Sequence, residues 1–431
     1  MRARTEDILR NYGVSAKNGF LSEQPPVACL PDIYYAPWES IVHCLPTLIT
    51  TSRIRSEIDA LPLLDTSRLH TEAEWQRAYS ILGFLTHAYI WGGDRPADRL
   101  PPQITCPLLE VSEHVGLPPT ATYSALNLWN WELKPGQVDL TKPENVRSLQ
   151  TATGTRDEEW FYLISVSVEA RGGPLIHTML QCIEAVERGD DEAVEHHLRH
   201  ITVGIQELGT LLNRMHEHCD PQVFYHVLRP LLAGSKGMAA AGLPNGVFYD
   251  EGNDHGQWRQ YSGGSNAQSS LIQLFDIVLG VDHHATGSSE TKKLANSSKT
   301  GSFIQEMRNY MPRQHREFLS YMTERGHVRE YVDTKDLGST IRSTYNAAVD
   351  ALVAFRNVHI QIVARYIINP SRCPPSERIL QRRSLNLATA SSKSGEAGGL
   401  EKQQLAGTGG TMLIPFLKKT RDETGEATIL E

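Results

Sequence analysis

The amino-acid sequence predicts an all-α protein. Apolar residues recur at steps of three and four positions wherever a pattern is visible, and the alternation typical of strands is nearly absent. The clearest helix follows residue 190, where Asp190 or Asp191 is suited to cap the first turn. Its apolar stripe consists of Val194, Leu198, Ile201, Ile205, Leu208, Leu212 and Met215.

The same period predicts helices along most of the chain. They are expected over residues 38–60, 72–92, 121–131, 144–151, 157–171, 174–187, 222–233, 266–280, 302–311, 313–325, 339–368 and 411–422. No internal repeat is visible. The hydrophobic core is therefore expected to form between packed helices.

Glycine and proline divide the chain unevenly. Residues 91–107 hold two glycines and four prolines, which predicts a boundary between a small N-terminal helical domain, 1–103, and a large C-terminal helical domain, 104–431. Two polar stretches, 285–302 and 371–411, are expected to be mobile. The second is long enough to act as a loop that orders over a ligand.

Composition excludes several classes of protein. The chain has 431 residues, of which 40% are hydrophobic and 21% charged, and its net charge of −8 argues against binding to nucleic acid. No stretch approaches the roughly 20 uncharged apolar residues of a membrane span. The six cysteines form no CxxC or CxxCH, which argues against a disulfide framework, a zinc knuckle and covalent c-type haem. We expect a cytoplasmic monomer.

One histidine lies in the middle of an apolar helical face. In the predicted helix 339–368, His359 shares that face with Leu352, Phe355, Ile362, Val363 and Tyr366. A buried imidazole without a partner costs about 1–3 kcal/mol, so a partner is expected. It is either a protein carbonyl or hydroxyl, or the iron of a haem whose flat ring covers the aliphatic neighbours. Arg356, one turn earlier, is either a structural or surface charge or a partner for a haem propionate.

Several blocks of sequence bear on this choice. They are LPDIYYAPWESIVHCLP at 30–46, YSGGSNAQSS at 261–270, FDIVLG at 275–280, RNYMPRQHREFL at 308–319, FRNVHIQIVARYIINP at 355–370 and AGTGGT at 406–411. In this order and spacing the chain resembles the indoleamine 2,3-dioxygenase family over nearly its whole length. The resemblance implies that the large domain encloses a b-type haem.

The resemblance assigns the cofactor-binding residues. It implies that His359 is the proximal ligand of the haem iron and that Arg356 binds a propionate, with Asp276 as its acidic partner. Gly264 and Ser265 match a turn of small residues against the haem edge and the substrate.

The same resemblance assigns a distal pocket. Phe161 and Phe224 match the aromatic residues that stack on the substrate, Ser165 a hydroxyl near bound oxygen, and Tyr123 a tyrosine of the inner pocket. Taken singly, the two phenylalanines are more simply explained as core residues and Ser165 as a hydroxyl bonded to its own helix. The segment offers no histidine or carboxylate near the distal position.

Two further residues match a clamp for an amino acid. Arg229 corresponds to the arginine that pairs with the substrate carboxylate, and Thr408 to a threonine that closes over the substrate; Ser265 also contributes. Arg229 could instead be a surface charge and Thr408 a mere component of a polar loop. Asn266 stands where vertebrate members of the family carry a smaller residue, and Leu126 replaces a cysteine of the inner pocket, so fine substrate preference and turnover are open.

The implied activity is the insertion of O2 across the indole C2–C3 bond of L-tryptophan to give N-formylkynurenine, the first step of the kynurenine route toward NAD. Its partners are L-tryptophan, O2 and an external reductant for ferric haem. The alternatives are a related haem enzyme that oxidises another indole in secondary metabolism, or a haem-binding sensor with little turnover. The remaining histidines that could suggest a metal site, His196, His197, His200 and the pair His283–His284, are expected at the surface.

Overall fold

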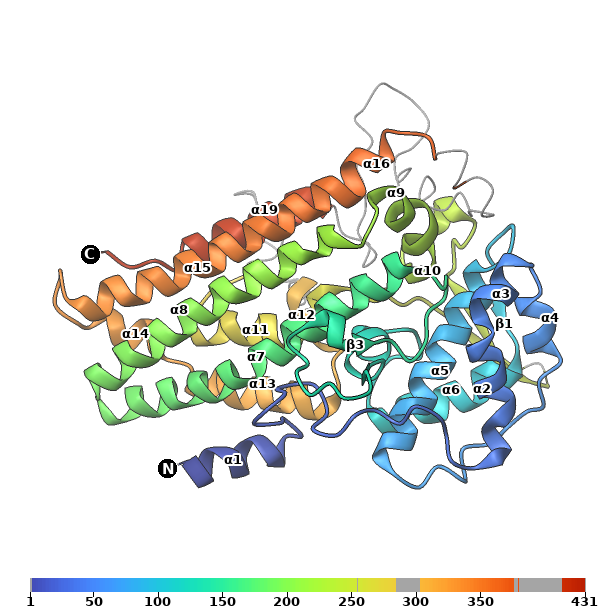
Figure 1. The fold of residues 1–431 in the computed structure, drawn as a ribbon, viewed down its shortest axis with the longest axis horizontal. Coiled ribbons are helices and arrows are strands. Elements are labelled where there is room, and N and C mark those ends of the chain that lie inside the picture. Colours follow the sequence, from blue (N-terminus) through green and yellow to red (C-terminus); the bar gives the residue numbers. More distant parts are fainter. Residues whose placement is uncertain (1, 254, 284–302, 376–378, 380–412, 431) are drawn as a thin grey trace, which may run out of the picture.

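The computed structural model describes residues 2–253, 255–283, 303–375, 379 and 413–430, and it is helical as predicted. Its longest helices are α7 (Arg156–Arg188), α8 (Asp191–Asn213) and α15 (Thr340–Val363), with α19 (Leu413–Gly425) beside α15. Figure 1 shows them side by side, α15 lying against both α8 and α19. The C-terminal helix is therefore a neighbour of the helix that carries His359.

Five helices form the other end of the molecule (Figure 1). They are α2 (Ala36–His43), α3 (Leu45–Thr50), α4 (Ile54–Asp59), α5 (Glu72–Trp91) and α6 (Pro102–Val115). The predicted helix 38–60 is wrong as one element, because Pro46 begins a new helix and Ser52 adopts a left-handed conformation. Helix α6 was missed because its prolines read as a break, whereas proline is well suited to the first turn of a helix.

Shorter helices connect these two groups. They are α1 (Arg2–Asn11), α9 (Pro221–Val223), α10 (Arg229–Leu232), α11 (Ser270–Val278), α12 (Phe303–Arg308), α13 (Arg313–Arg325), α14 (Val328–Asp333) and α16 (Asn369–Ser371). Single turns of 3-10 helix occur at Ile33–Tyr35, Pro143–Asn145, Arg214–Glu217, Ala239–Ala241 and Asn266–Gln268. π-Helical segments occur at Ser124–Leu128, Phe224–Leu228 and Ala364–Ile368. The first follows Tyr123, and the second begins with Phe224 and is followed by Arg229, all of which are predicted site residues.

The sequence did not predict the small amount of β-structure. Strands β1 (Arg99–Leu100), β4 (Val247–Gly252) and β5 (His255–Arg259) form a sheet in the order β1-β4-β5, with β1 parallel and β5 antiparallel to β4. Strand β2 (Glu132–Leu133) pairs with β3 (Val146–Arg147). The predicted helix 144–151 is wrong, because β3 and a 3-10 turn occupy its first residues.

Helix α7 joins two predicted helices, 157–171 and 174–187, into one. It begins where Thr155 accepts a hydrogen bond from the Glu158 backbone and ends at Gly189, whose φ of 69° suits a C-terminal cap. Gly173 within it does not interrupt the helix. A Cβ there would lie 2.6 Å from the backbone nitrogen of Gly19, so this glycine permits close contact with the N-terminal segment.

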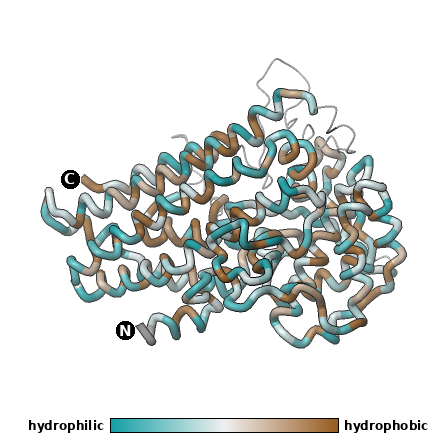
Figure 2. Tube along the Cα trace, in the orientation of Figure 1, coloured by the Kyte–Doolittle hydropathy of each residue, from teal (hydrophilic) through white to brown (hydrophobic). Residues whose placement is uncertain are grey.

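The core follows the predicted stripe. Asp190 caps α8 by accepting a hydrogen bond from Ala193, and the apolar residues predicted from Val194 to Leu208 are buried. Figure 2 shows hydrophobic and hydrophilic residues alternating along the long helices, as expected when one face of each helix is buried. One apolar cluster extends from Leu9 to Ala427. The domain boundary near residue 103 stays a prediction.

One helix among the described residues, Thr340–Ser371, is long and apolar enough to cross a membrane by length and composition alone. It contains α15, which packs against α8 and α19 within the protein. The core helix of a soluble protein has the same composition, so this feature is weak support for a membrane span.

Candidate functional site

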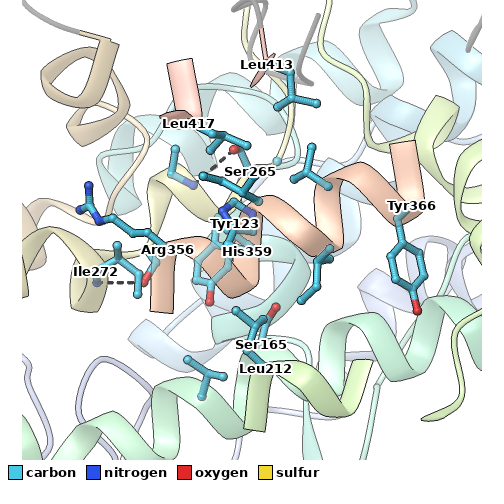
Figure 3. Close-up of a pocket in the computed structure, with 18 of the residues that line it drawn as sticks. Tyr123, Ser165, Leu212, Ser265, Ile272, Arg356, His359, Tyr366, Leu413 and Leu417 are labelled. Carbon is cyan, nitrogen blue, oxygen red and sulfur yellow. Dashed lines mark hydrogen bonds between the residues drawn. The ribbon is translucent and has the colours of Figure 1, made fainter. Parts of the chain in front are cut away.

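A cavity of about 250 Å³ lies where α7, α11, α15 and α19 meet the π-helical segments (Figure 3). It brings together ten residues that the sequence predicted for the site: Tyr123, Phe161, Ser165, Phe224, Arg229, Gly264, Ser265, Asp276, Arg356 and His359. Thr408 and most of the predicted mobile loop 371–411 lie outside the described residues. The cavity wall is otherwise mostly aliphatic and aromatic.

His359 borders the cavity from α15 and is partly exposed to it. Burial lowers the pKa of the imidazole to about 4, and the positive charge of Arg356 acts in the same direction. The ring is therefore neutral at physiological pH. Within the described part of the chain, no hydrogen bond or ion pair of this ring is found, so the alternative of a protein carbonyl or hydroxyl partner gains no support. A neutral imidazole facing a cavity is suited to bind a metal.

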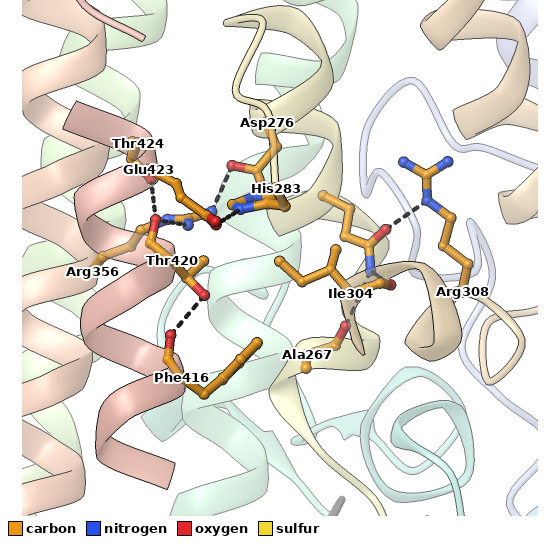
Figure 4. A network of polar contacts seen from close by, with 11 residues as sticks. Ala267, Asp276, His283, Ile304, Arg308, Arg356, Phe416, Thr420, Glu423 and Thr424 are labelled. Carbon is orange, nitrogen blue, oxygen red and sulfur yellow. Dashed lines mark hydrogen bonds and ion pairs between the residues drawn. The ribbon is translucent and has the colours of Figure 1, made fainter. Parts of the chain in front are cut away.

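Arg356 lies behind His359 in a buried polar network (Figure 4). Its guanidinium donates a hydrogen bond to Asp276 Oδ1 at 2.5 Å and another to the Thr420 carbonyl of α19 at 2.9 Å. Burial alone would raise the pKa of Asp276, but the Arg356 charge and His283 hold it below its ordinary value. Arg356 Nε is buried and has no hydrogen-bond partner among the described residues. One donor of this arginine is thus left for an acceptor that the described chain does not supply.

His283 is not a surface residue, and that prediction was wrong. Its side chain is 9% exposed and lies between two carboxylates, with Nε2 3.1 Å from Asp276 Oδ2 and Nδ1 2.7 Å from Glu423 Oε2 (Figure 4). Burial alone would lower the pKa of His283, but Asp276 and Glu423 outweigh it and raise the pKa. His284 lies outside the described residues. His196 and His200 are exposed as predicted, and His197 is half-buried. In the described ranges, no cluster of three or more His, Cys, Asp or Glu side chains could hold a metal ion.

Aromatic rings form one wall of the cavity. The rings of Phe161 and Phe224 meet edge to face with centroids 5.1 Å apart, and Phe224 makes a second edge-to-face contact with Tyr366 at 5.6 Å. Tyr366 is fixed by donating a hydrogen bond to the Cys219 carbonyl at 2.9 Å. These contacts hold flat faces at defined angles to the cavity, an arrangement that suits a flat aromatic ligand.

Arg229 is the first residue of α10 and is buried against the same cavity. Burial lowers the pKa of its guanidinium, and its carbon Cζ lies 5.4 Å from the centroid of the Tyr225 ring. The surface alternative for this arginine is therefore wrong. A buried guanidinium beside a cavity can recognise a carboxylate through two parallel hydrogen bonds.

The turn 261–270 forms another side of the cavity. Gly264 packs against Leu126, since a Cβ at this glycine would lie 2.3 Å from Leu126 Cδ1. Ser265 caps the following 3-10 turn by accepting a hydrogen bond from Ala267 N at 3.3 Å. Gln268 accepts a hydrogen bond from the Tyr123 backbone at 2.8 Å, which ties the turn to the inner pocket. Both family departures, Leu126 and Asn266, line the cavity.

A buried carboxyl group lies behind the inner pocket. Tyr123 donates a hydrogen bond from its hydroxyl to Glu169 Oε1 at 3.0 Å, and Ser269 donates another at 2.7 Å. Burial raises the pKa of Glu169 to about 7. Ser165 donates a weak hydrogen bond, at 3.4 Å, to the Phe161 carbonyl of its own helix. The sequence did not indicate a carboxylate near this position, because Glu169 does not line the cavity and reaches it through Tyr123 and Ser269.

Comparison with known proteins identifies the family. The family model described as indoleamine 2,3-dioxygenase matches residues 8–427. The chain is a member of the indoleamine 2,3-dioxygenase family. It is 42% identical to indoleamine 2,3-dioxygenase acdA of Aspergillus candidus, over 98% of each chain. It is 41% identical to the Saccharomyces cerevisiae indoleamine 2,3-dioxygenase, over 98% of this chain and 94% of that one.

A third relative differs in its named substrate. The chain is 37% identical to 6-hydroxytryptophan 2,3-dioxygenase fscD of Fusarium equiseti, over 98% of this chain and 99% of that one. The indoleamine 2,3-dioxygenase family consists of oxidoreductases that are generally haem-dependent. The residues at the cavity fit such a cofactor, because they combine a neutral histidine, apolar walls and an arginine with a buried unused donor.

One side of the cavity was not predicted from the sequence. Leu413, Phe416, Leu417 and Thr420 of α19 line it, although the helix lies some fifty residues or more beyond His359 in the chain. A helix was predicted over 411–422, but its amphipathic pattern alone does not reveal which face of the protein it covers. Only the contact between α15 and α19 does so.

Proposed function

We propose that this protein is a haem-dependent dioxygenase that inserts O2 across the indole C2–C3 bond of L-tryptophan and releases N-formylkynurenine. The observation that carries the proposal is His359, a neutral imidazole on the wall of an apolar cavity, for which the described chain supplies no hydrogen-bond partner. His359 would bind the iron, and Arg356 would bind a propionate through the guanidinium that Asp276 holds in place.

When bound, the haem supplies the activation of O2 that cleavage of the indole ring requires. The protein positions the substrate and excludes water from it. Phe161 and Phe224 stack on the indole, and their mutual edge-to-face contact limits the angles available to it. Ser165 and Tyr123 border the inner end of the cavity and offer the hydroxyl groups there.

Arg229 would hold the carboxylate of the amino acid. Its burial strengthens the ion pair, because few water molecules compete for the guanidinium. Ser265 lies on the same cavity and would contact the substrate from the turn 261–270. Closure by Thr408, supply of electrons by an external reductant, a monomeric state and a cytoplasmic location stay predictions from the sequence.

The first test is removal of the proposed iron ligand. His359→Gly should abolish the Soret absorption band of protein incubated with hemin and purified, because no other imidazole among the described residues borders the cavity. Free imidazole added to this variant should restore the band by occupying the vacated position. A Soret band in His359→Gly that equals that of the unmodified protein would refute iron ligation by His359.

His226→Ala is the matched control. His226 is partly buried, its Nε2 has no hydrogen-bond partner among the described residues, and it does not line the cavity. This variant should take up as much haem as the unmodified protein. Equal losses in the two variants would show that destabilisation, and not ligation, removes the band.

A second candidate is the oxidation of another indole in secondary metabolism. It is favoured by the relative whose name specifies 6-hydroxytryptophan, and by Leu126 and Asn266, which alter the lining of the cavity. The reduced, haem-loaded protein should be supplied with O2 and either L-tryptophan or 6-hydroxytryptophan, and the products measured by mass spectrometry. A higher kcat/KM for the hydroxylated compound would favour this candidate over the first.

A further inference from the structure

Glu169 is a buried acid that the proposed chemistry does not use. It belongs to α7, is 1% exposed, and accepts hydrogen bonds from Tyr123 and Ser269 on the same oxygen, Oε1. Its other oxygen, Oε2, is buried and has no hydrogen-bond partner in the described part of the chain. Only one of the two carboxylate oxygens therefore receives hydrogen bonds from the described residues, which makes the ionised form of Glu169 costly.

No charged group among the described residues compensates for this cost. Burial is the largest influence on the pKa of Glu169, and the two that oppose it are the hydroxyls of Ser269 and Tyr123. On α13, His315 faces Ser270, and burial lowers its pKa to about 3, so it carries no charge. The Arg171–Glu207 ion pair between α7 and α8 is exposed. Glu169 can therefore gain or lose a proton near neutral pH while the charges of the neighbouring groups stay the same.

The hydroxyl of Tyr123 connects this acid to the cavity. The Tyr123 hydroxyl donates a hydrogen bond to Glu169. It also lies close to the Ser165 hydroxyl: burial raises the pKa of Tyr123, whereas Ser165 lowers it. Figure 3 shows the hydroxyl end of Tyr123 directed toward Ser165. Glu169, Tyr123 and Ser165 thus form a row of polar groups that ends at the cavity.

The direction of hydrogen bonds in such a row depends on its acid. If Glu169 is ionised, Tyr123 donates to it and can only accept from Ser165. If Glu169 is protonated, it can donate to Tyr123, which then donates to Ser165 and leaves the Ser165 proton free to turn toward the cavity. One proton on the acid therefore changes what Ser165 offers to a ligand.

We propose that Glu169 is a positioning residue that sets, through Tyr123, whether Ser165 presents a hydrogen-bond donor or an acceptor to a ligand in the cavity. This inference rests on the proposed function only in taking that ligand to be bound at a haem. The row of groups itself belongs to the polypeptide and can be tested without the cofactor.

The test with haem uses carbon monoxide as a probe of the cavity. The C–O stretching frequency of the ferrous carbon monoxide complex responds to nearby hydrogen-bond donors, and in the unmodified protein it should shift with a midpoint near pH 7. In Glu169→Gln, whose amide can donate as the protonated acid does, the frequency should stay at the low-pH value at every pH. Tyr123→Phe should also remove the pH dependence. A pH-dependent shift that persists in Glu169→Gln overturns the proposal, as does its absence from the unmodified protein.

Glu158→Gln is the matched control. Glu158 lies on the same helix, is equally buried, has a raised pKa and accepts a hydrogen bond from a tyrosine, Tyr162, but neither residue lines the cavity. This variant should retain the pH-dependent shift of the unmodified protein. Loss of the shift in both glutamine variants would assign it to altered packing of α7 and overturn the proposal.

A second measurement needs no haem and separates this inference from the proposed function. In haem-free protein, infrared spectra recorded against pH should contain a protonated-carboxyl band that Glu169→Gln removes. Ser165→Ala should shift the frequency or midpoint of this band, since Ser165 acts on Glu169 through Tyr123. A band unchanged by Ser165→Ala overturns the row of groups, whether or not the protein binds haem. If Ser165→Ala shifts the band but the unmodified protein does not bind haem, only the proposed function is refuted.

Discussion

Arg229 combines a permanent charge with nearly complete burial, at 4% exposure beside an apolar cavity. Burial lowers the pKa of its guanidinium, which shows that burial makes the charged form more costly. An anion that enters the cavity relieves this cost. At the scale of a single residue, a buried arginine beside aromatic rings therefore favours a ligand with both a carboxylate and a flat ring.

Arg229→Lys tests this role. Lysine keeps the charge but lacks the planar pair of donors, so kcat/KM for L-tryptophan should fall about 10- to 100-fold, or roughly 1.4–2.7 kcal/mol. Tryptamine, which has the same indole and no carboxylate, should lose far less. Steady-state kinetics with both compounds make the comparison. Equal losses would mean that Arg229 supports the structure of α10 and does not bind the carboxylate.

At the scale of an element, α19 is held to the rest of the protein by buried charges. Glu423 on α19 contacts His283, which contacts Asp276, and Asp276 in turn accepts a hydrogen bond from Arg356. The Thr420 carbonyl of α19 also accepts from Arg356. Docking of α19 is therefore coupled to the residues behind His359, although the helix is distant from them in sequence.

The docking of α19 should depend on pH. Because Asp276 and Glu423 raise the folded-state pKa of His283 above the ordinary 6.5, its protonation stabilises the folded arrangement. This contribution is fully present below pH 6.5 and is lost as pH rises through the folded-state pKa. Hydrogen exchange of α19 amides, corrected for intrinsic rates, should show protection that decreases over this range.

His283→Gln should remove that pH dependence and lower the stability of α19 docking by roughly 1.5–3 kcal/mol, the usual cost of losing a hydrogen bond to a charged group. His196→Gln, at an exposed position on α8, serves as the control and should leave the protection of α19 unchanged. Protection in His283→Gln that still decreases with pH as in the unmodified protein would contradict the coupling.

At the scale of the whole molecule, α7 connects the parts that form the cavity. It carries Phe161, Ser165 and Glu169 on the side of the site, contacts α8 and α11, and packs at Gly173 against the N-terminal segment. A Cβ at Gly173 would meet the backbone of Lys17, Asn18 and Gly19 at 2.6–2.7 Å. Backbone atoms cannot turn aside as a side chain can, so this contact resists any added volume.

Gly173→Ala should therefore destabilise the protein by about 1–3 kcal/mol, measured by thermal or chemical unfolding. Gly209→Ala is the matched control on α8, because a Cβ there would meet only Phe355 Cδ2, at an ordinary 4.0 Å. That variant should be neutral or gain up to about 1 kcal/mol from the better helix propensity of alanine. Similar destabilisation by both changes would show that the contact between α7 and the N-terminal segment is not tight.

The sequence by itself determined the strongly periodic helices and the family. Helix α8, its Asp190 cap and its buried stripe follow from interactions between residues three or four positions apart, which a sequence displays directly. The blocks around His359 and Ser265 likewise indicated the family that comparison then identified. The family resemblance also named ten of the residues that border the cavity, with Thr408 outside the described residues.

The family resemblance implied the pairing of Asp276 with Arg356, which the structure contains, but the tertiary structure alone decided the other buried polar partners. Nothing near His283 in sequence reveals Glu423, and Glu169 appears as one more glutamate until Tyr123 and Ser269 are seen on the same oxygen. The physical reason is that helix periodicity reports which face of a helix is buried, whereas the partner of a buried charge is set by how distant segments pack. The pKa of such a group depends on that partner and on its burial, so neither can be obtained from local sequence.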